Sequence, residues 1–104
     1  MKLLGLCLAA GILCALALYP ARAAFSDGNE LHEACSREEP FKSFCAGYII
    51  GVFDSFEGEH CAPAGVTIIQ VHDVVKKYVD GHPEVRHLDA TSLVLTALRR
   101  AFPC

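Results

Sequence analysis

Cysteine carries most of the chemistry that this sequence offers, at Cys35, Cys45, Cys61 and Cys104. An even number of cysteines in a short chain outside the cytoplasm is typical of disulfides, and four cysteines allow three pairings. Zinc binding is the alternative, but the sequence has no C-x-x-C and its five histidines are scattered, so zinc is disfavoured. Because oxidised cysteines cannot attack a substrate, we predict no catalytic Cys/His pair.

No other combination of side chains matches a catalytic site. The sequence lacks the G-x-S-x-G, H-E-x-x-H and glycine-rich phosphate-binding motifs. Pro83 lies between His82 and His87 and spoils a helical ligand pair, so these histidines are interpreted as solvated turn residues. The cluster Glu57, Glu59 and His60 is interpreted as a charged loop rim. The sequence therefore predicts a binding protein and not an enzyme, with no cofactor and no metal.

The first 23 residues have the pattern of a cleavable signal peptide. Lys2 gives a positive start, an uncharged apolar stretch follows from Leu3 to Leu18, and Ala21-Arg22-Ala23 is a small-x-small cleavage site. A membrane anchor is the alternative, but the apolar run of about 16 residues is shorter than the roughly 20 that span a bilayer. We expect cleavage after Ala23, which leaves a domain of residues 24–104 in the periplasm.

The mature chain is small and acidic. Removing 23 of the 104 residues leaves 81, and it takes away Lys2 and Arg22 but no acidic residue. Seven basic residues then stand against 12 acidic ones, a net charge of −5 with neutral histidines. This charge gives the chain no electrostatic reason to bind nucleic acid or, after signal cleavage, an anionic membrane. A core of this size is marginal without disulfides.

Apolar residues at helical spacing predict four helices and no strand alternation. The third segment is dense in β-branched residues, so a strand is its competitor. We expect an all-α fold, a small four-helix up-and-down domain stapled by two disulfides. The expected helices cover about 28–35, 41–56, 68–80 and 89–102.

The helix ends carry capping signals. Asn29 or Ser26 is expected to cap the first helix, and Thr67 with Gln70 forms a capping box for the third. Gly81 fits the left-handed position that ends the third helix. On that helix we expect Ile68 to face the core and His72 to face solvent.

The second helix has an apolar stripe and, on another face, Gly47 and Gly51. Each glycine weakens a helix by roughly 1 kcal/mol relative to alanine, so a close neighbour over this face is expected. Either another helix of the monomer covers the two glycines, or they lie in a subunit interface. The second interpretation predicts a homodimer.

Helix geometry restricts the disulfide pairing. A continuous second helix separates Cys45 from Cys61 by roughly 16 rises of 1.5 Å, about 24 Å. A disulfide needs Cα atoms within about 7 Å, so Cys45–Cys61 is excluded. In an up-and-down arrangement, the first helix ends near the start of the second, and the second ends near the end of the fourth. This arrangement favours Cys35–Cys45 and Cys61–Cys104 over the crossed pairing.

Residues 45–54 read CAGYIIGVFD, which resembles the C-x-G-Y-I-x-G-V-x-D pattern of the Rap/Tai family of type VI secretion immunity proteins. The likeness runs from about Leu31 to Cys104 and includes residues 61–67, His82-Pro83-Glu84 and the ending Ala101-Phe102-Pro103-Cys104. It implies a periplasmic, helical and commonly dimeric protein. Its implied partner is a cognate peptidoglycan amidase effector, which it would bind and inhibit to protect the producing cell.

The connector between the third and fourth helices is the predicted contact with this partner. Gly81 and Pro83 limit its backbone freedom, which lowers the cost of ordering it on binding. An alternative is a plain helix–helix turn whose residues cap the helices, and the loop 57–61 is a competing contact surface. The predicted partner-binding residues are Asp80, His82, Glu84, Arg86 and His87.

The alternative function belongs to a different class of protein. Small periplasmic chaperones of the acid-stress type, or general periplasmic binding proteins, also combine a signal peptide, a disulfide and helices. Five histidines and 12 carboxylates would supply a pH trigger for such a chaperone. No spacing in the sequence specifies this trigger, so immunity is the favoured interpretation.

Overall fold

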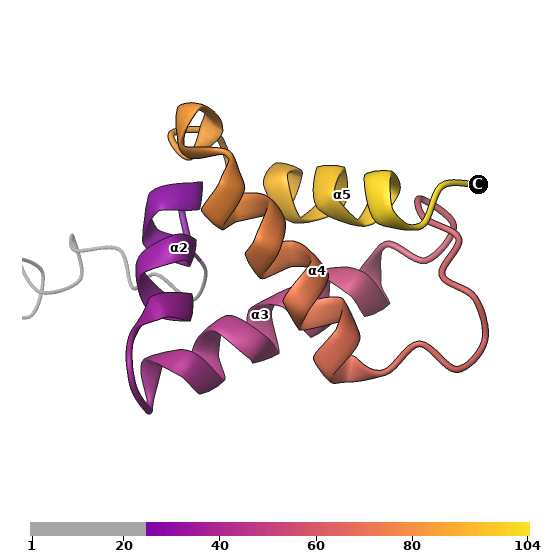
Figure 1. Cartoon of the computed structure of the whole chain (residues 1–104), viewed down its shortest axis with the longest axis horizontal. Helices are drawn as coiled ribbons and strands as arrows, with labels where there is room; N and C mark the ends of the chain where they lie inside the picture. Colours follow the sequence, from indigo (N-terminus) through magenta and orange to yellow (C-terminus); the bar gives the residue numbers. More distant parts are fainter. Residues whose placement is uncertain (1–24) are drawn as a thin grey trace, which may run out of the picture.

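The computed structural model describes residues 25–104, which fold into four α-helices (Figure 1). The predicted signal peptide and its cleavage site fall outside the described residues. No described helix has the length and apolar character needed to cross a bilayer. The helices are α2 (Gly28–Ser36), α3 (Phe41–Ser55), α4 (Ile68–Gly81) and α5 (Ala90–Ala101), with a 3₁₀ turn at Pro83–Val85.

The helices surround one core. In Figure 1, α3 and α5 both extend roughly horizontally, with α5 above α3. The helices α2 and α4 run between the height of α5 and the height of α3. α2 packs mainly on α3, and α4 packs on both α5 and α3. The predicted all-α four-helix domain is therefore confirmed, and the strand alternative for the third segment is wrong. The buried residues include Leu31, Cys45, Ile49, Val71, Val75, Val79, Val94, Ala97 and Leu98.

Both predicted disulfides are present. Cys35 pairs with Cys45 across the α2–α3 turn, with Cα atoms 5.1 Å apart. Cys61 pairs with Cys104, with Cα atoms 5.0 Å apart, and joins the loop after α3 to the C-terminal end. The prediction succeeded because α3 is a continuous helix, which keeps Cys45 and Cys61 apart, and because α2 ends near the start of α3 while the loop after α3 lies near the C-terminal end.

Two of the three predicted helix-end signals differ from expectation. Asp27, and not Asn29 or Ser26, caps α2, because its extended backbone lets its carboxylate accept the Glu30 N–H at 3.0 Å. Thr67 caps α4 as predicted, accepting the Gln70 N–H at 3.1 Å.

Gly81 does not take the left-handed conformation. It is the last residue of α4, and the described glycines with positive φ are Gly58 and Gly65, both at 91°. The end of α4 needs no left-handed residue because His82 and Arg86 side chains approach its last carbonyls.

Two predicted orientations on α4 are wrong. Ile68 is 64 % exposed because it lies in the first turn of α4, beyond the edge of the core. His72 is largely covered, with a side-chain exposure of 15 %, because α4 crosses α3 close to Cys45.

Candidate binding site

Arg86 fixes the connector between α4 and α5. Its Nε donates to the Val79 carbonyl oxygen at 2.9 Å, and its Nη2 donates to the Asp80 carbonyl oxygen at 2.9 Å. Both acceptors belong to the last turn of α4, whose carbonyls have no partner within the helix. A cation at this end also complements the helix dipole. Arg86 therefore folds the connector back onto α4.

His82 is held by the same turn. Its Nδ1–H donates to the Tyr78 carbonyl oxygen at 2.7 Å, and its ring stacks on the Tyr78 ring with centroids 4.1 Å apart. The guanidinium of Arg100, from the last turn of α5, lies 5.2 Å from the centre of the Tyr78 ring. This stack ties the connector to both helices.

The Asp80 carboxylate accepts hydrogen bonds from Lys76 and His32. Lys76 Nζ donates to one carboxylate oxygen at 2.6 Å, and His32 Nδ1 donates to the other at 2.9 Å. Partial burial raises the pKa of Asp80, but the hydrogen bonds and charge of Lys76 and His32 outweigh it and hold the pKa below its usual value. Asp80 and Lys76 also line an open surface hollow on α4, together with Asp73, Lys77 and Gly81.

The start of α2 holds the other end of the connector. The Gly28 N–H donates to the Leu88 carbonyl oxygen at 2.9 Å, and the Asn29 N–H donates to the Arg86 carbonyl oxygen at 2.8 Å. A side chain at Gly28 would collide with Leu93 and with the Arg86 backbone, so only glycine permits this approach. The connector is thus attached to α2 as well as to α4.

The five predicted partner-binding residues lie together at this connector but fall into two groups. Arg86, His82 and Asp80 hold the local structure, as the turn interpretation expected. The side chains of Glu84 and His87 are exposed and have no hydrogen bond or ion pair within residues 25–104. Exposed Pro83 and Leu88 flank them. Binding by these five residues stays a prediction. Glu84 and His87 are the two whose side chains are available to contact a partner.

The competing loop before α4 is also held by side-chain and backbone contacts. His60 is buried, at 7 % exposure, where it stacks on Phe53 and its Nε2–H donates to the Phe53 carbonyl oxygen at 3.2 Å. The interpretation of His60 as part of a charged rim is therefore wrong. Glu59 pairs with Arg99 of α5, and the Cys61 N–H donates to the Phe102 carbonyl oxygen at 2.9 Å.

Sequence reasoning missed an apolar surface beside this loop. Ile68 and Ile69, at the start of α4, are 64 % and 72 % exposed. Apolar spacing assigned Ile68 to the core, and it does not show that the first turn of α4 lies beyond the core, where both isoleucines are exposed. Exposed large apolar side chains of this kind are typical contacts of binding proteins.

The Gly47/Gly51 face of α3 is open. Both glycines are exposed, and no atom lies within 4 Å of the position of a Cβ at either one. The interpretation that a helix of the same monomer covers them is wrong. Phe44, on the same face by its spacing of three and seven residues, is 61 % exposed.

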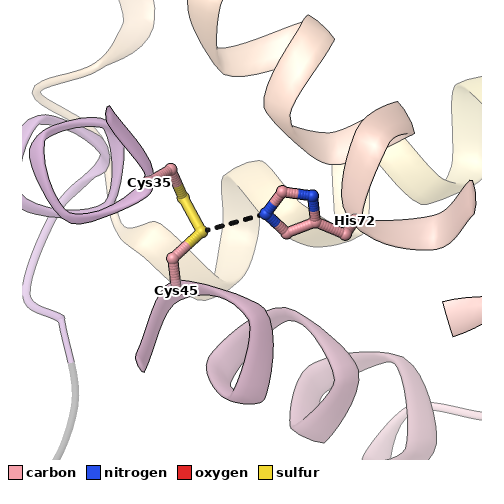
Figure 2. A group of neighbouring side chains, drawn as sticks. All are labelled: Cys35, Cys45 and His72. Carbon is pink, nitrogen blue, oxygen red and sulfur yellow. Dashed lines mark hydrogen bonds between the residues drawn. A yellow bond between two sulfur atoms is a disulfide. The ribbon is translucent and has the colours of Figure 1, made fainter. Parts of the chain in front are cut away.

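One group in residues 25–104 has the donor atoms and spacing of a metal site. It consists of Cys35, Cys45 and His72, whose ligand atoms lie within 4.8 Å of one another (Figure 2). With the cysteines oxidised, the sulfurs are not available as thiolate ligands. No sequence pattern indicates this group, because the crossing of α4 over α3 brings His72 to Cys45.

Comparisons with known proteins identify the family. A family model described as Rap1a immunity proteins matches residues 27–104. Neither the curated proteins nor the solved structures gave a match. The matched range contains all four described helices and both disulfides. The resemblance seen in the sequence is thereby confirmed, and the chain belongs to the Rap1a immunity protein family.

Proposed function

We propose that this protein acts in the periplasm, where it binds and inhibits a type VI secretion effector that is a cell-wall amidase. Immunity proteins are not enzymes, and they bind a cognate effector. The observation that carries the proposal is the family match over residues 27–104. This match also favours immunity over the chaperone alternative. The two disulfides fit an oxidising compartment such as the periplasm.

The contact surface that we propose is the connector between α4 and α5. Arg86, Gly28 and Asn29 fix its backbone before any partner arrives. Preorganisation of this kind lowers the entropy that binding must overcome. Glu84 and His87 then present polar groups toward the partner, and Leu88, which is 44 % exposed, supplies apolar area beside them.

The test compares variants of exposed residues only. The double variant Glu84→Ala/His87→Ala leaves the contacts of Arg86 and His82 in place, so it changes the surface without loosening the connector. We expect at least about tenfold weaker binding to the cognate amidase, equivalent to about 1.4 kcal/mol. Calorimetry measures the affinity, inhibition of peptidoglycan cleavage measures the activity, and circular dichroism checks the fold.

Two control variants separate the competing surfaces. Glu57→Ala, in the loop before α4, is expected to leave the affinity unchanged. Ile68→Ser/Ile69→Ser tests the apolar surface; if it alone abolishes inhibition, the contact lies there and not at the connector. A wild-type protein that binds no amidase contradicts the proposed function itself.

A homodimer is part of the same proposal. Phe44, Gly47 and Gly51 form an exposed face along α3, with open space over both glycines. Glycines in this arrangement let two helices approach closely, and the exposed phenylalanine adds apolar area. The seam that we propose is this face packed against its copy in a second subunit, as expected for an isologous twofold interface.

A further inference from the structure

His72 faces the disulfide between Cys35 and Cys45. Its Nε2 lies 3.6 Å from Cys45 Sγ, and the three residues come from α4, α2 and α3 (Figure 2). Cys45 is fully buried and Cys35 is 6 % exposed, whereas the His72 side chain keeps 15 % exposure. The group therefore lies where three helices meet, with the imidazole on its solvent side.

The disulfide offers the His72 imidazole no hydrogen-bond donor. His72 Nδ1 lies 3.3 Å from Asp73 Oδ1, which favours the proton on Nδ1. Nε2 then points a lone pair at a sulfur atom that has no hydrogen to donate. A carboxylate on one ring nitrogen and a bare lone pair on the other is the arrangement of a metal-binding histidine.

The separation of the donors fits tetrahedral zinc. Zn–S bonds of about 2.3 Å and Zn–N bonds of about 2.0–2.1 Å place sulfur and nitrogen about 3.5 Å apart. The distance between Cys45 Sγ and His72 Nε2 is 3.6 Å. The backbone of α3 and α4 thus already holds two of the donors at the spacing of bound ligands. The Cys35 sulfur joins them once the disulfide is open and its side chain rotates.

We propose that the protein in its dithiol form binds one Zn²⁺ through Cys35 Sγ, Cys45 Sγ and His72 Nε2. Water takes the fourth position on the exposed side. A dithiol reduces the Cys35–Cys45 bond by supplying two electrons and two protons, which breaks the S–S bond, and the dithiol itself becomes a disulfide. Zn²⁺ then replaces the two thiol protons, which are released to solvent. The bound metal joins α2, α3 and α4 at the junction where the disulfide joins α2 and α3.

Cobalt and zinc titrations of the reduced mature chain test this site. Residues 24–104 are reduced without oxygen by a phosphine, titrated with Co²⁺ and then with Zn²⁺. We expect one equivalent of Co²⁺, with the visible absorption of a tetrahedral thiolate site, and its displacement by Zn²⁺. His72→Ala removes a direct ligand, so it should weaken binding by at least the roughly 10–100-fold that loss of an outer-shell partner costs.

Matched variants identify the ligands. Cys61→Ser/Cys104→Ser leaves only the proposed cysteines, and His32→Ala removes another histidine paired with an aspartate, so both should bind metal like the wild type. Circular dichroism follows folding, and any helix lost on reduction should return with Zn²⁺ in the wild type but not in His72→Ala. Unchanged binding by His72→Ala, loss of binding in Cys61→Ser/Cys104→Ser, or a reduced chain that binds no metal would overturn the proposal.

Discussion

The Leu93 side chain occupies the space that a Cβ would need at Gly28, and this contact brings the start of α2 against α5 and the connector. The Arg86 carbonyl oxygen would lie 2.8 Å from the same Cβ. Gly28→Ala should therefore lower the free energy of unfolding by about 1–3 kcal/mol through overpacking. Urea denaturation measures the change.

Gly81→Ala is the matched control. Gly81 is the last residue of α4, it has no positive φ, and no atom lies within 4 Å of its Cβ position, so alanine should leave the stability unchanged or raise it by up to about 1 kcal/mol. Equal stability of Gly28→Ala and the wild type would contradict the close packing at Gly28.

The two disulfides should contribute unequally. The loop that Cys35–Cys45 closes spans 10 residues, and the loop that Cys61–Cys104 closes spans 43. Loop-closure entropy gives about 3 kcal/mol for the first and about 4 kcal/mol for the second. Cys61→Ser/Cys104→Ser should therefore destabilise more than Cys35→Ser/Cys45→Ser, as measured by thermal unfolding. The intact mature chain should show no free thiol, and titratable thiols in periplasmic material would count against both bonds.

A large side chain at Gly51 tests the proposed dimer seam. Gly51→Leu places a branched side chain where no atom lies within 4 Å, so it should not disturb the monomer fold. In the dimer, the leucine would separate the two helices, and we expect at least about a tenfold rise in the dissociation constant. Analytical ultracentrifugation measures it, with Lys77→Leu on exposed α4 as control. An unchanged dimer in Gly51→Leu would place the seam elsewhere, and a monomeric wild type would reject the dimer.

Asp80 links stability to pH. Its folded pKa lies below the usual value of 3.8, so its ion pairs stabilise the fold above that pH. The contribution is lost as pH falls through the lower, folded pKa, when the carboxylate gains a proton. Because the side chain is 38 % exposed, screening limits the effect to at most about 1 kcal/mol.

Asp80→Asn should therefore be less stable than the wild type at neutral pH, and the difference should vanish in acid. Chemical denaturation at a series of pH values measures it. Asp54→Asn, an exposed aspartate without an ion pair among residues 25–104, should show no such difference. A difference between Asp80→Asn and the wild type that persists at low pH would show that the contacts of Asp80 act by packing and not by charge.

The sequence by itself determined the features that depend on neighbours along the chain. Four helices follow from apolar spacing, the Thr67 cap from local backbone chemistry, and the exclusion of a Cys45–Cys61 bond from the length of α3. The expected up-and-down order of the helices then favoured the two disulfides that form. The family followed in the same way, because its pattern of cysteines, glycines and apolar residues is a pattern of sequence. Periodicity also assigned Ile68 to the apolar side of α4, but it carries no information on where the core ends.

Only the tertiary structure decided which of these residues are buried and which side chains meet. His60 is buried because the Cys61–Cys104 disulfide draws its loop toward the end of α5, and His72 meets Cys45 because α4 crosses α3. Gly81 stays helical because Arg86, five residues further on at the connector, satisfies carbonyls that a left-handed glycine would otherwise help to satisfy. These outcomes depend on how helices cross and on which side chains reach a given atom. Neither the helix crossings nor these side-chain contacts can be predicted from the spacing of residues along one helix.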